Sequence, residues 1–289
     1  MRTEVVIALN SQLVQGLDPM PPGVWRAIRH LPETEILPFA RLRLPKSDLR
    51  SIQTRLDRIE EFESALNELR DAGIQAITEF DPEYPPSWND TLREKRPSYL
   101  FAMGNVELLS KPAVGVVGSR SIDSDGSAFA AQIGAEAVKL GYAVVSGGAK
   151  GADEIAMRAA IQAGGTAIGY LADSLLKHGA KWDIESGPVC LASPYGPDTG
   201  FQVGMAMNRN KFIYGGSVAT VVVASDLETG GTWAGAIEAL KLELCPLIVR
   251  ACKLPGNRAL ISRGGHPIEH PKDLEKCLTY RRKSQTSLL

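Results

Sequence analysis

Ala143-Val-Val-Ser-Gly-Gly-Ala-Lys-Gly-Ala-Asp153 decides the fold, because an apolar strand runs directly into glycines and then opens a helix. An earlier stretch, Ala113-Val-Gly-Val-Val-Gly-Ser-Arg120, has the same strand-then-glycine form. Each stretch places backbone N–H groups and one cation, Lys150 or Arg120, beyond the carboxyl end of its strand. A helix N-terminus at that place attracts anions, so the two stretches together predict a cradle for phosphate groups.

From residue 113 onward, the pattern predicts alternating strands and helices, interrupted by a Pro/Gly-rich stretch at 187–200. Its apolar runs show no polar alternation, which is typical of strands covered on both faces. The predicted strands are 113–118, 142–146, 166–171, 218–224 and 246–250, and the predicted helices are about 126–140, 151–163, 203–215 and 231–243. This order predicts an α/β fold with a doubly wound, mainly parallel, Rossmann-like sheet.

The first part of the chain has a different pattern of apolar residues and prolines, which predicts a small N-terminal helical module. Residues 47–72 carry an apolar side chain every three or four positions, which indicates one or two amphipathic helices ending at Gly73. Upstream, several prolines predict short pieces, with one helix near 22–30. The predicted domains are a mainly helical module at 1–78, a connector with a strand (99–103) at 79–110, a Rossmann-like domain at 111–272 and a tail at 273–289.

Composition limits the classes of partner and site. The 289 residues are 44% hydrophobic, enough for a packed core, and carry a formal net charge of -1. A polyanion would therefore have to meet a local basic patch. The four cysteines have no metal-site spacing and are expected to be reduced structural thiols. No apolar run reaches the length of a membrane span and no leader pattern begins the chain, so we expect a cytoplasmic protein without metal or cofactor.

Four groups of residues follow predicted strands or open predicted helices, and should meet in the crevice where strand order reverses. They lie at 118–120, 146–150, 208–211 and 228–232. Together they offer several cations against one nearby acid, so the crevice is expected to be electropositive. The first loop lacks the G-x-G-x-x-G spacing of dinucleotide sites, and no stretch fits G-x-x-x-x-G-K-[ST].

The sequence offers little for catalysis. None of the four histidines falls in the strand-end loops, and Glu238 is a crevice carboxylate only if its helix turns it inward. Gly147 and Gly148 also fit a plain role in a tight turn, although Lys150 in the same turn favours a ligand. Asp153 is most simply a residue that complements the helix dipole. We therefore expect a binding protein with no catalytic residue.

Several motifs occur in the order seen in the DNA-processing protein A (DprA/Smf) family, which this chain resembles over about residues 73 to 265. They are Val116-Val-Gly-Ser-Arg120, Ser146-Gly-Gly-Ala-Lys-Gly-Ala-Asp153, Arg209-Asn-Lys211 followed by Ile213-x-Gly-Gly-Ser217, and Gly256-Asn-Arg-Ala-Leu-Ile-Ser-Arg-Gly264, after the lead-in Asp81-Pro-Glu-Tyr-Pro85 and Pro97-Ser-Tyr-Leu-Phe-x-x-Gly-Asn105.

This resemblance implies a Rossmann-like domain that binds single-stranded DNA, forms a homodimer and helps to load a RecA-type recombinase in transformation, recombination or mobile-element defence. It implies no enzymatic activity. It also makes Phe201 a candidate for base stacking. The residues expected to contact DNA or phosphate are Gly118, Ser119, Arg120, Ser146, Gly147, Gly148, Lys150, Phe201, Arg209, Asn210, Lys211, Gly230 and Gly231.

The chain departs from the family pattern in three places. The usual Phe-x-x-Arg-Asn-Arg run is stretched between Phe201 and Arg209, and its second arginine is Lys211. A Thr-Gly-Gly-Thr-Trp segment is expected to put the bulky Trp233 near the crevice. The resemblance also implies a divergent member without the C-terminal winged helix that many members carry.

Other functions use the same crevice or leave it unused. A free nucleotide or nucleotide-derived signal would suit a small pocket, whereas nucleotide hydrolysis fits less well because Gly-Gly-x-Gly-Thr-x-x-Glu is not matched in spacing before Glu238. A scaffold whose N-terminal module recruits a partner is the third alternative.

Overall fold

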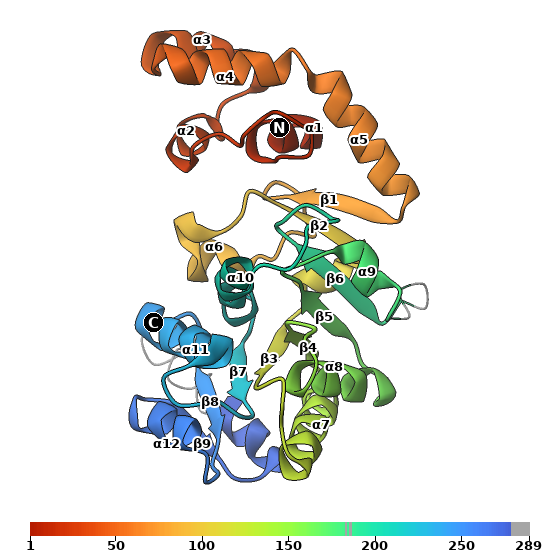
Figure 1. Ribbon diagram of the computed structural model, residues 1–289, viewed down its shortest axis with the longest axis vertical. Helices are drawn as coiled ribbons and strands as arrows, with labels where there is room; N and C mark the ends of the chain where they lie inside the picture. The colour runs from red at the N-terminus through yellow and green to blue at the C-terminus, as the bar shows by residue number, and fades with distance from the viewer. Residues whose placement is uncertain (183, 185–186, 279–289) are drawn as a thin grey trace.

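A nine-stranded sheet forms the centre of the molecule (Figure 1). The structure is a computed structural model that describes residues 1–182, 184 and 187–278. Across the sheet the strands are β1 (Ile74–Thr78), β2 (Tyr99–Gly104), β6 (Val189–Ser193), β5 (Ala167–Tyr170), β4 (Ala143–Ser146), β3 (Ala113–Val117), β7 (Ala219–Val222), β8 (Leu247–Arg250) and β9 (His266–Ile268). The strands from β3 to β9 pair in parallel, while β2 is antiparallel to β6 and β1 to β2. The predicted doubly wound, mainly parallel sheet is confirmed.

The strand order reverses beside β3. The chain adds β4, β5 and β6 on one side of β3, then returns to add β7, β8 and β9 on the other side. Since the loops after β3 and β7 leave in opposite directions, a crevice opens between them at the carboxyl edge of the sheet.

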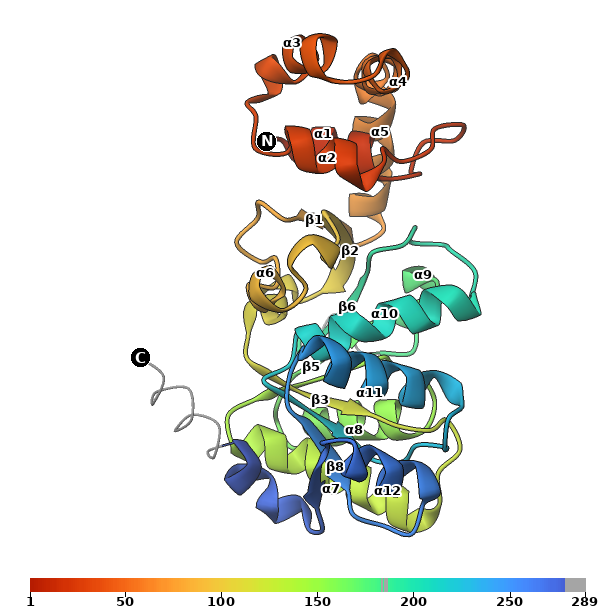
Figure 2. The same cartoon turned by 90° about the vertical axis from the view of Figure 1, so that its left-hand side faces the viewer.

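Helices cover both faces of this sheet (Figures 1 and 2). One face carries α7 (Ser124–Lys139) and α8 (Ala152–Gln162), and the other carries α10 (Val203–Gly215), α11 (Gly230–Leu242) and α12 (Pro255–Ser262). All residues of β3 are buried, with Val114 and Val116 packing toward α7 and α8, and Ala113 and Val117 toward α10, α11 and α12. The unbroken apolar character of this strand follows from that double burial.

The N-terminal residues form a helical module at one end of the molecule (Figures 1 and 2). Prolines begin most of its helices instead of cutting the chain into short pieces, because a missing N–H costs nothing in a first turn. Pro38 lies inside a helix, contrary to the prediction. The helices are α1 (Thr3–Asn10), α2 (Pro22–Ile28), α3 (Glu33–Arg43), α4 (Lys46–Leu56) and α5 (Ile59–Asp71).

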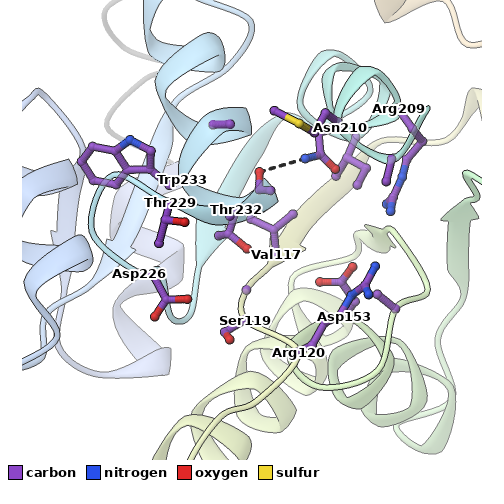
Figure 3. A pocket seen from close by; sticks show the side chains of 18 of the residues that line it. Val117, Ser119, Arg120, Asp153, Arg209, Asn210, Asp226, Thr229, Thr232 and Trp233 are labelled. Carbon is purple, nitrogen blue, oxygen red and sulfur yellow. Dashed lines mark hydrogen bonds between the residues drawn. The ribbon is translucent and has the colours of Figure 1, made fainter. Parts of the chain in front are cut away.

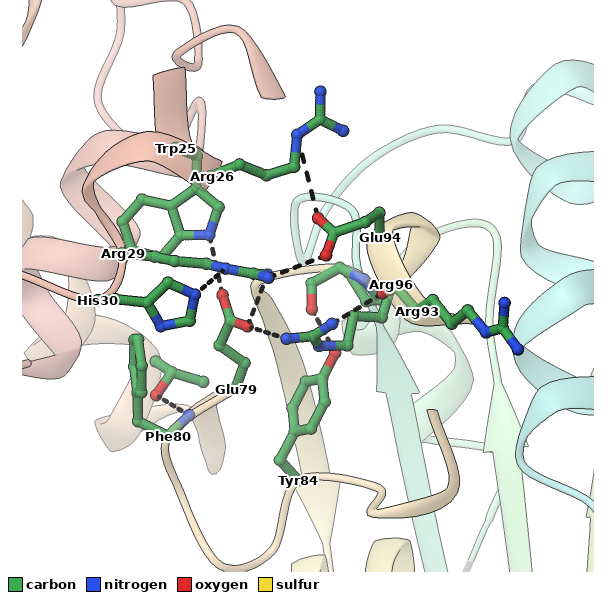
Figure 4. Close-up of polar contacts among 12 residues, drawn as sticks. Trp25, Arg26, Arg29, His30, Glu79, Phe80, Tyr84, Arg93, Glu94 and Arg96 are labelled. Carbon is green, nitrogen blue, oxygen red and sulfur yellow. Dashed lines mark hydrogen bonds and ion pairs between the residues drawn. The ribbon is translucent and has the colours of Figure 1, made fainter. Parts of the chain in front are cut away.

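A buried polar cluster fastens this module to the connector (Figure 4). The side chain of Glu79, only 4% exposed, accepts hydrogen bonds from Trp25 Nε1 at 2.9 Å, from Arg29 at 3.3 Å and from Arg96 at 2.8 Å. Because Trp25 and Arg29 belong to α2 and its C-terminal end, the carboxylate ties the two parts of the chain together.

Three strands were not predicted: β1, β6 and, at the edge of the sheet, β9. The segment 187–200 was interpreted as a Pro/Gly-rich interruption, yet β6 within it is fully buried beside β5. Likewise, β1 lies within the stretch 1–78 predicted as mainly helical. The predicted domain boundaries stay a prediction, and residues 279–289 of the predicted tail lie outside the described residues. The remaining short elements are α6 (Ser87–Thr91), η1 (Arg93–Lys95), η2 (Val106–Ser110), α9 (Leu175–Gly179) and η3 (Pro271–Asp273).

Candidate nucleotide-phosphate pocket

A pocket of about 700 Å³ lies at the crevice where the strand order reverses (Figure 3). Its walls are the loop after β3 (117–120), parts of the loop that joins β4 to α8, one side of α10, and residues 226–234 around the start of α11. The predicted place of a ligand site thus coincides with a concave surface of ligand size.

Arg209 on α10 is the central cation of this pocket. It is only 7% exposed, and its Nε and Nη1 atoms have no hydrogen-bond partner among the described residues. Burial lowers the pKa of the guanidinium, and the carboxylates of Asp153 and Asp173 oppose that shift. A buried guanidinium with unused donors costs free energy, so this side chain is held ready to bind an anion.

Gly147 makes room for Arg209. A Cβ atom at residue 147 would lie 1.6 Å from Nη1 of Arg209, so the guanidinium rests directly against the backbone after β4. The neighbouring Gly148 has φ +64, a conformation that favours glycine. These two glycines therefore shape the wall behind the arginine.

Asp153 faces the same space from the first turn of α8. Its carboxylate accepts a hydrogen bond from the N–H of Gly147 at 3.2 Å. Burial raises the pKa of Asp153 to about 6, against the opposing effects of Arg209 and of nearby backbone N–H groups. The carboxylate is therefore held mainly by backbone amides and leaves donors of Arg209 unused.

Arg120 and Phe201 form the outer part of the same wall. The guanidinium carbon of Arg120 lies 5.1 Å from the centre of the Phe201 ring, a cation–π contact. Phe201 is 49% exposed, and the neighbouring Val203 and Met207 are exposed as well. An exposed aromatic ring beside cations offers a stacking surface for a nucleobase.

The N-terminus of α11 closes the opposite wall. Thr229 provides no side-chain cap, and Gly230 has φ +80. Asn210 on α10 donates a hydrogen bond from Nδ2 to the carbonyl of Gly231 at 2.9 Å, which joins the two helices across the pocket. The uncapped first turn of a thirteen-residue helix presents N–H groups to an anion.

The expected charge balance is corrected. The pocket is lined by two arginines and by three carboxylates, those of Asp153, Asp226 and Glu228, instead of by an excess of cations over one acid. In Figure 3 Asp226 lies on the side away from Arg209 and Arg120. Glu228 lies 3.7 Å from Arg263. The attraction for anions is therefore local to the half of the pocket that holds the two arginines.

The predicted binding residues divide into three groups. Ser146 donates its hydroxyl to the carbonyl of Val116 at 2.5 Å and, with Gly147 and Gly148, supports the wall from behind. Lys150 and Lys211 are not among the lining residues, and their contact with phosphate stays a prediction. Those that line the pocket are Gly118, Ser119, Arg120, Phe201, Arg209, Asn210, Gly230 and Gly231.

Lys211 lies on α10 but does not line the pocket with Arg209. Helix spacing alone does not explain this, because Met207, also two positions from Arg209, does line the pocket. Lys211 instead donates a hydrogen bond to Asn208 at 2.7 Å and lies over the Phe212 ring.

The residues predicted to bind do not include several that the structure brings to the pocket. Asp226 and Glu228 follow β7 directly, and their position after a strand was the signal that could have revealed them. Trp233 does reach the pocket edge, but in Figure 3 its indole points away from Arg209, and the Arg263 guanidinium lies 5.2 Å from its ring centre. Neither Glu238 nor any histidine of the described chain belongs to the lining.

In residues 1–182, 184 and 187–278, no helix combines the length and apolar character that a membrane crossing requires. The same residues contain no group of three or more His, Cys, Asp or Glu side chains placed to hold a metal ion.

Two proteins with similar sequences are both DNA processing protein DprA, from different bacteria. The chain is 31% identical over 173 residues to DNA processing protein DprA of Bacillus subtilis, a match covering 56% of each protein. It is 36% identical over 95 residues to DNA processing protein DprA of Streptococcus pneumoniae, covering 33% of each. The matches therefore span about half or less of the length of these curated relatives.

Solved structures of DNA processing protein A are also similar to this chain. DNA processing protein A of Streptococcus pneumoniae superposes with a TM-score of 0.73 at 21% identity, covering 96% of this chain and 98% of that one. DNA processing protein A of Helicobacter pylori, solved to show its single-stranded DNA binding mode, gives 0.61 at 25% identity, with 72% and 97% covered. The family model for DNA recombination-mediator protein A matches residues 75–279. This chain, with its Rossmann-like sheet and its pocket beside β3, belongs to the DNA recombination-mediator protein A family.

Proposed function

We propose that the pocket binds the backbone of single-stranded DNA and that the protein acts by binding, without catalysis, in DNA processing for recombination. The observation that carries the proposal is Arg209, a buried guanidinium in the pocket wall whose Nε and Nη1 donors have no partner among the described residues. A phosphodiester would supply the missing acceptors, and charged hydrogen bonds of this kind contribute about 1.5–3 kcal/mol each.

Three further features support a single strand. Arg120 and the uncapped start of α11 offer additional donors for phosphate, and Phe201 offers a ring on which an unpaired base can stack. Stacking of this type contributes about 1–3 kcal/mol per base and tolerates any sequence. A paired base inside a duplex could not reach such a ring, so the pocket favours single strands.

The finer role follows from the family. The Helicobacter relative is described by its single-stranded DNA binding mode. By extension we propose that a RecA-type recombinase and a second copy of this chain are its protein partners, in transformation, recombination or mobile-element defence. Light scattering of the purified protein, and its retention by a RecA-type recombinase on single-stranded DNA, test these two partners.

The binding proposal is tested with a fluorescent oligothymidine at two salt concentrations. We expect binding that weakens with salt, because cations on the protein displace counterions from the strand. Arg209→Met should lower the affinity by about tenfold to a hundredfold, and Arg120→Ala by less, since its side chain is exposed. Arg70→Ala on α5, which removes an exposed cation outside the pocket, is the matched control and should bind like the parent.

Two results would contradict this assignment: no binding at low salt, or an Arg209→Met protein that folds normally and binds as the parent does.

The pocket volume favours one alternative, a free nucleotide or nucleotide-derived signal, because about 700 Å³ suits a small ligand. Calorimetric titration with nucleoside monophosphates separates the two, since a sensor would bind the monomer at least as tightly as the oligonucleotide. Release of free base during that incubation would indicate a hydrolase.

A further inference from the structure

Lys211 connects the pocket wall to a second positive surface. It follows Asn210 on α10, but its side chain leaves the helix away from the pocket. Burial lowers the pKa of its amino group, the charge of Glu238 opposes this shift, and the charge of Lys95 adds to it. Lys211 thus lies near both a carboxylate of α11 and a cation of η1.

Side-chain hydrogen bonds hold the segment before η1 beside α10. Trp88 Nε1 donates to the carbonyl of Phe212 at 3.2 Å, and Thr91 Oγ1 donates to the carbonyl of Gly215 at 3.0 Å. These two carbonyls belong to the turn that follows Lys211. The cations of η1 are therefore fixed next to the helix that carries Arg209 and Asn210 into the pocket.

Arg93 begins η1 in an unusual backbone conformation. Its φ of 51° lies in the left-handed region, which disfavours any residue with a Cβ atom. The carbonyl of Arg93 accepts a hydrogen bond from Arg96 Nη1 at 2.8 Å, which stabilises this turn. Glycine would adopt the conformation without strain, so the arginine at this position requires a reason other than the turn.

The side chain of Arg93 takes no part in the cluster around Glu79 (Figure 4). In Figure 4 its guanidinium points away from the Glu79 cluster. Among the described residues, neither Arg93 nor Lys95 has a carboxylate at ion-pair distance, whereas the adjacent Glu94 pairs with Arg29 at 3.1 Å and with Arg26 at 4.0 Å. The two outer cations of η1 thus remain available to an anion.

We infer that Lys211, Lys95 and Arg93 form an exit track along which the DNA strand leaves the pocket, crosses α10 and reaches the junction with the helical module. This inference rests on the proposed function, because the strand held at Arg209 is the polyanion that continues over these cations. The occupant has a repeating negative charge, which complements Arg93 and Lys95, the two cations of the track without a carboxylate at ion-pair distance among the described residues.

The length of the oligonucleotide separates the track from the pocket. An oligothymidine of about five nucleotides fills the pocket alone, whereas one of about sixteen also covers the track. Arg93→Gln/Lys95→Gln should bind the short strand as the parent does. Its affinity for the long strand should fall about tenfold, and the slope of log affinity against log salt should shrink by about one to one and a half, because each single-strand phosphate contact contributes about 0.7. Lys211→Gln should show the same pattern with a smaller change.

The matched control is Arg41→Gln/Arg43→Gln, which removes two exposed arginines from α3 and should bind both lengths normally. A second variant, Arg93→Gly, should raise the midpoint of thermal unfolding, because it relieves the strained backbone, and should still weaken binding of the long strand. Equal binding of the long strand by parent and double variant would overturn the track, as would equal losses at both lengths. A parent that fails to bind the short strand would contradict the proposed function itself.

Discussion

Two buried arginines, in two parts of the molecule, show how differently one side chain can be used. At the junction with the helical module, Arg29 donates from Nε to His30, from Nη1 to Glu79 and from Nη2 to Glu94. In the pocket, Arg209 is more completely buried but leaves Nε and Nη1 without a partner in the described chain. The first arginine is engaged in holding the fold, whereas the second is held by the fold for a ligand.

The largest expected effect concerns the junction. Glu79→Ala leaves Arg29 and Arg96 without their shared carboxylate and removes the acceptor of Trp25 Nε1. Breaking a buried ion pair from one side costs about 3–5 kcal/mol, so the free energy of unfolding in urea should fall by that amount. The protein that remains folded should still bind a short oligothymidine, because the pocket is untouched.

Glu61→Ala is the control for that experiment. It removes an acid from an exposed pair with Arg58, which solvent already screens, so its unfolding curve should match that of the parent. A Glu79→Ala protein as stable as the parent would show that the junction does not depend on this cluster and would remove the contrast between the two arginines.

A smaller effect is expected where the pocket arginine rests on Gly147. In Gly147→Ala the new methyl group would meet Nη1 of Arg209 at 1.6 Å, so the guanidinium must move. Because overpacking of this kind costs about 1–3 kcal/mol, we expect affinity for short oligothymidine to fall about tenfold. Gly141→Ala is the control. Its new Cβ meets open space, and although a φ of +82 strains the backbone of an alanine there, this change should leave binding unchanged. Normal binding by Gly147→Ala would mean that Arg209 does not contact the strand from this position.

Much of this fold could be predicted from local pattern. A strand that runs into glycine and then a helix repeats along the chain, and the helix predicted at 203–215 has those bounds in the structure. The β6 strand was missed because five buried residues between prolines carry no periodicity that separates a strand from a loop. Which strands are neighbours depends on contacts between distant residues, and these are not visible in any local window.

The location of the candidate site could be predicted from the sequence, but the full set of side chains that line it could not. Strand ends located Arg120, Arg209 and the start of α11 together. That Lys211 does not line the pocket could not be deduced from the helix period alone, because Met207, also two positions from Arg209, does line it. The position of Asp226 and Glu228 after β7 was visible in the sequence, but whether they face the pocket was not, because the path of their loop depends on the packing of α11 and α12.

Asp153 is the acid that Arg209 faces in the pocket, and its protonation provides a further test of how Arg209 is used. Its pKa in the folded protein is about 6, above the usual 3.8, because burial disfavours the charged form. A carboxyl whose folded pKa is raised binds its proton more tightly in the folded state. Its contribution to stability is therefore complete below about pH 4 and is lost as the pH rises through about 6.

The same proton should control DNA affinity. Protonation of Asp153 removes a negative charge beside Arg209 while a phosphodiester stays ionised, so affinity for short oligothymidine should rise severalfold between about pH 7.5 and about pH 5. Asp153→Asn keeps an oxygen that can accept from Gly147 but has no charge to lose. It should bind more tightly than the parent at the higher pH and show the smaller pH dependence. His178 and Asp173 form an ion pair near Arg209, so the difference between parent and variant is the quantity to compare, with His178→Gln as the control for that pair. Parallel pH profiles for parent and Asp153→Asn would mean that the strand does not sense this carboxylate, and the phosphate would then have to lie nearer to Arg120 than to Arg209.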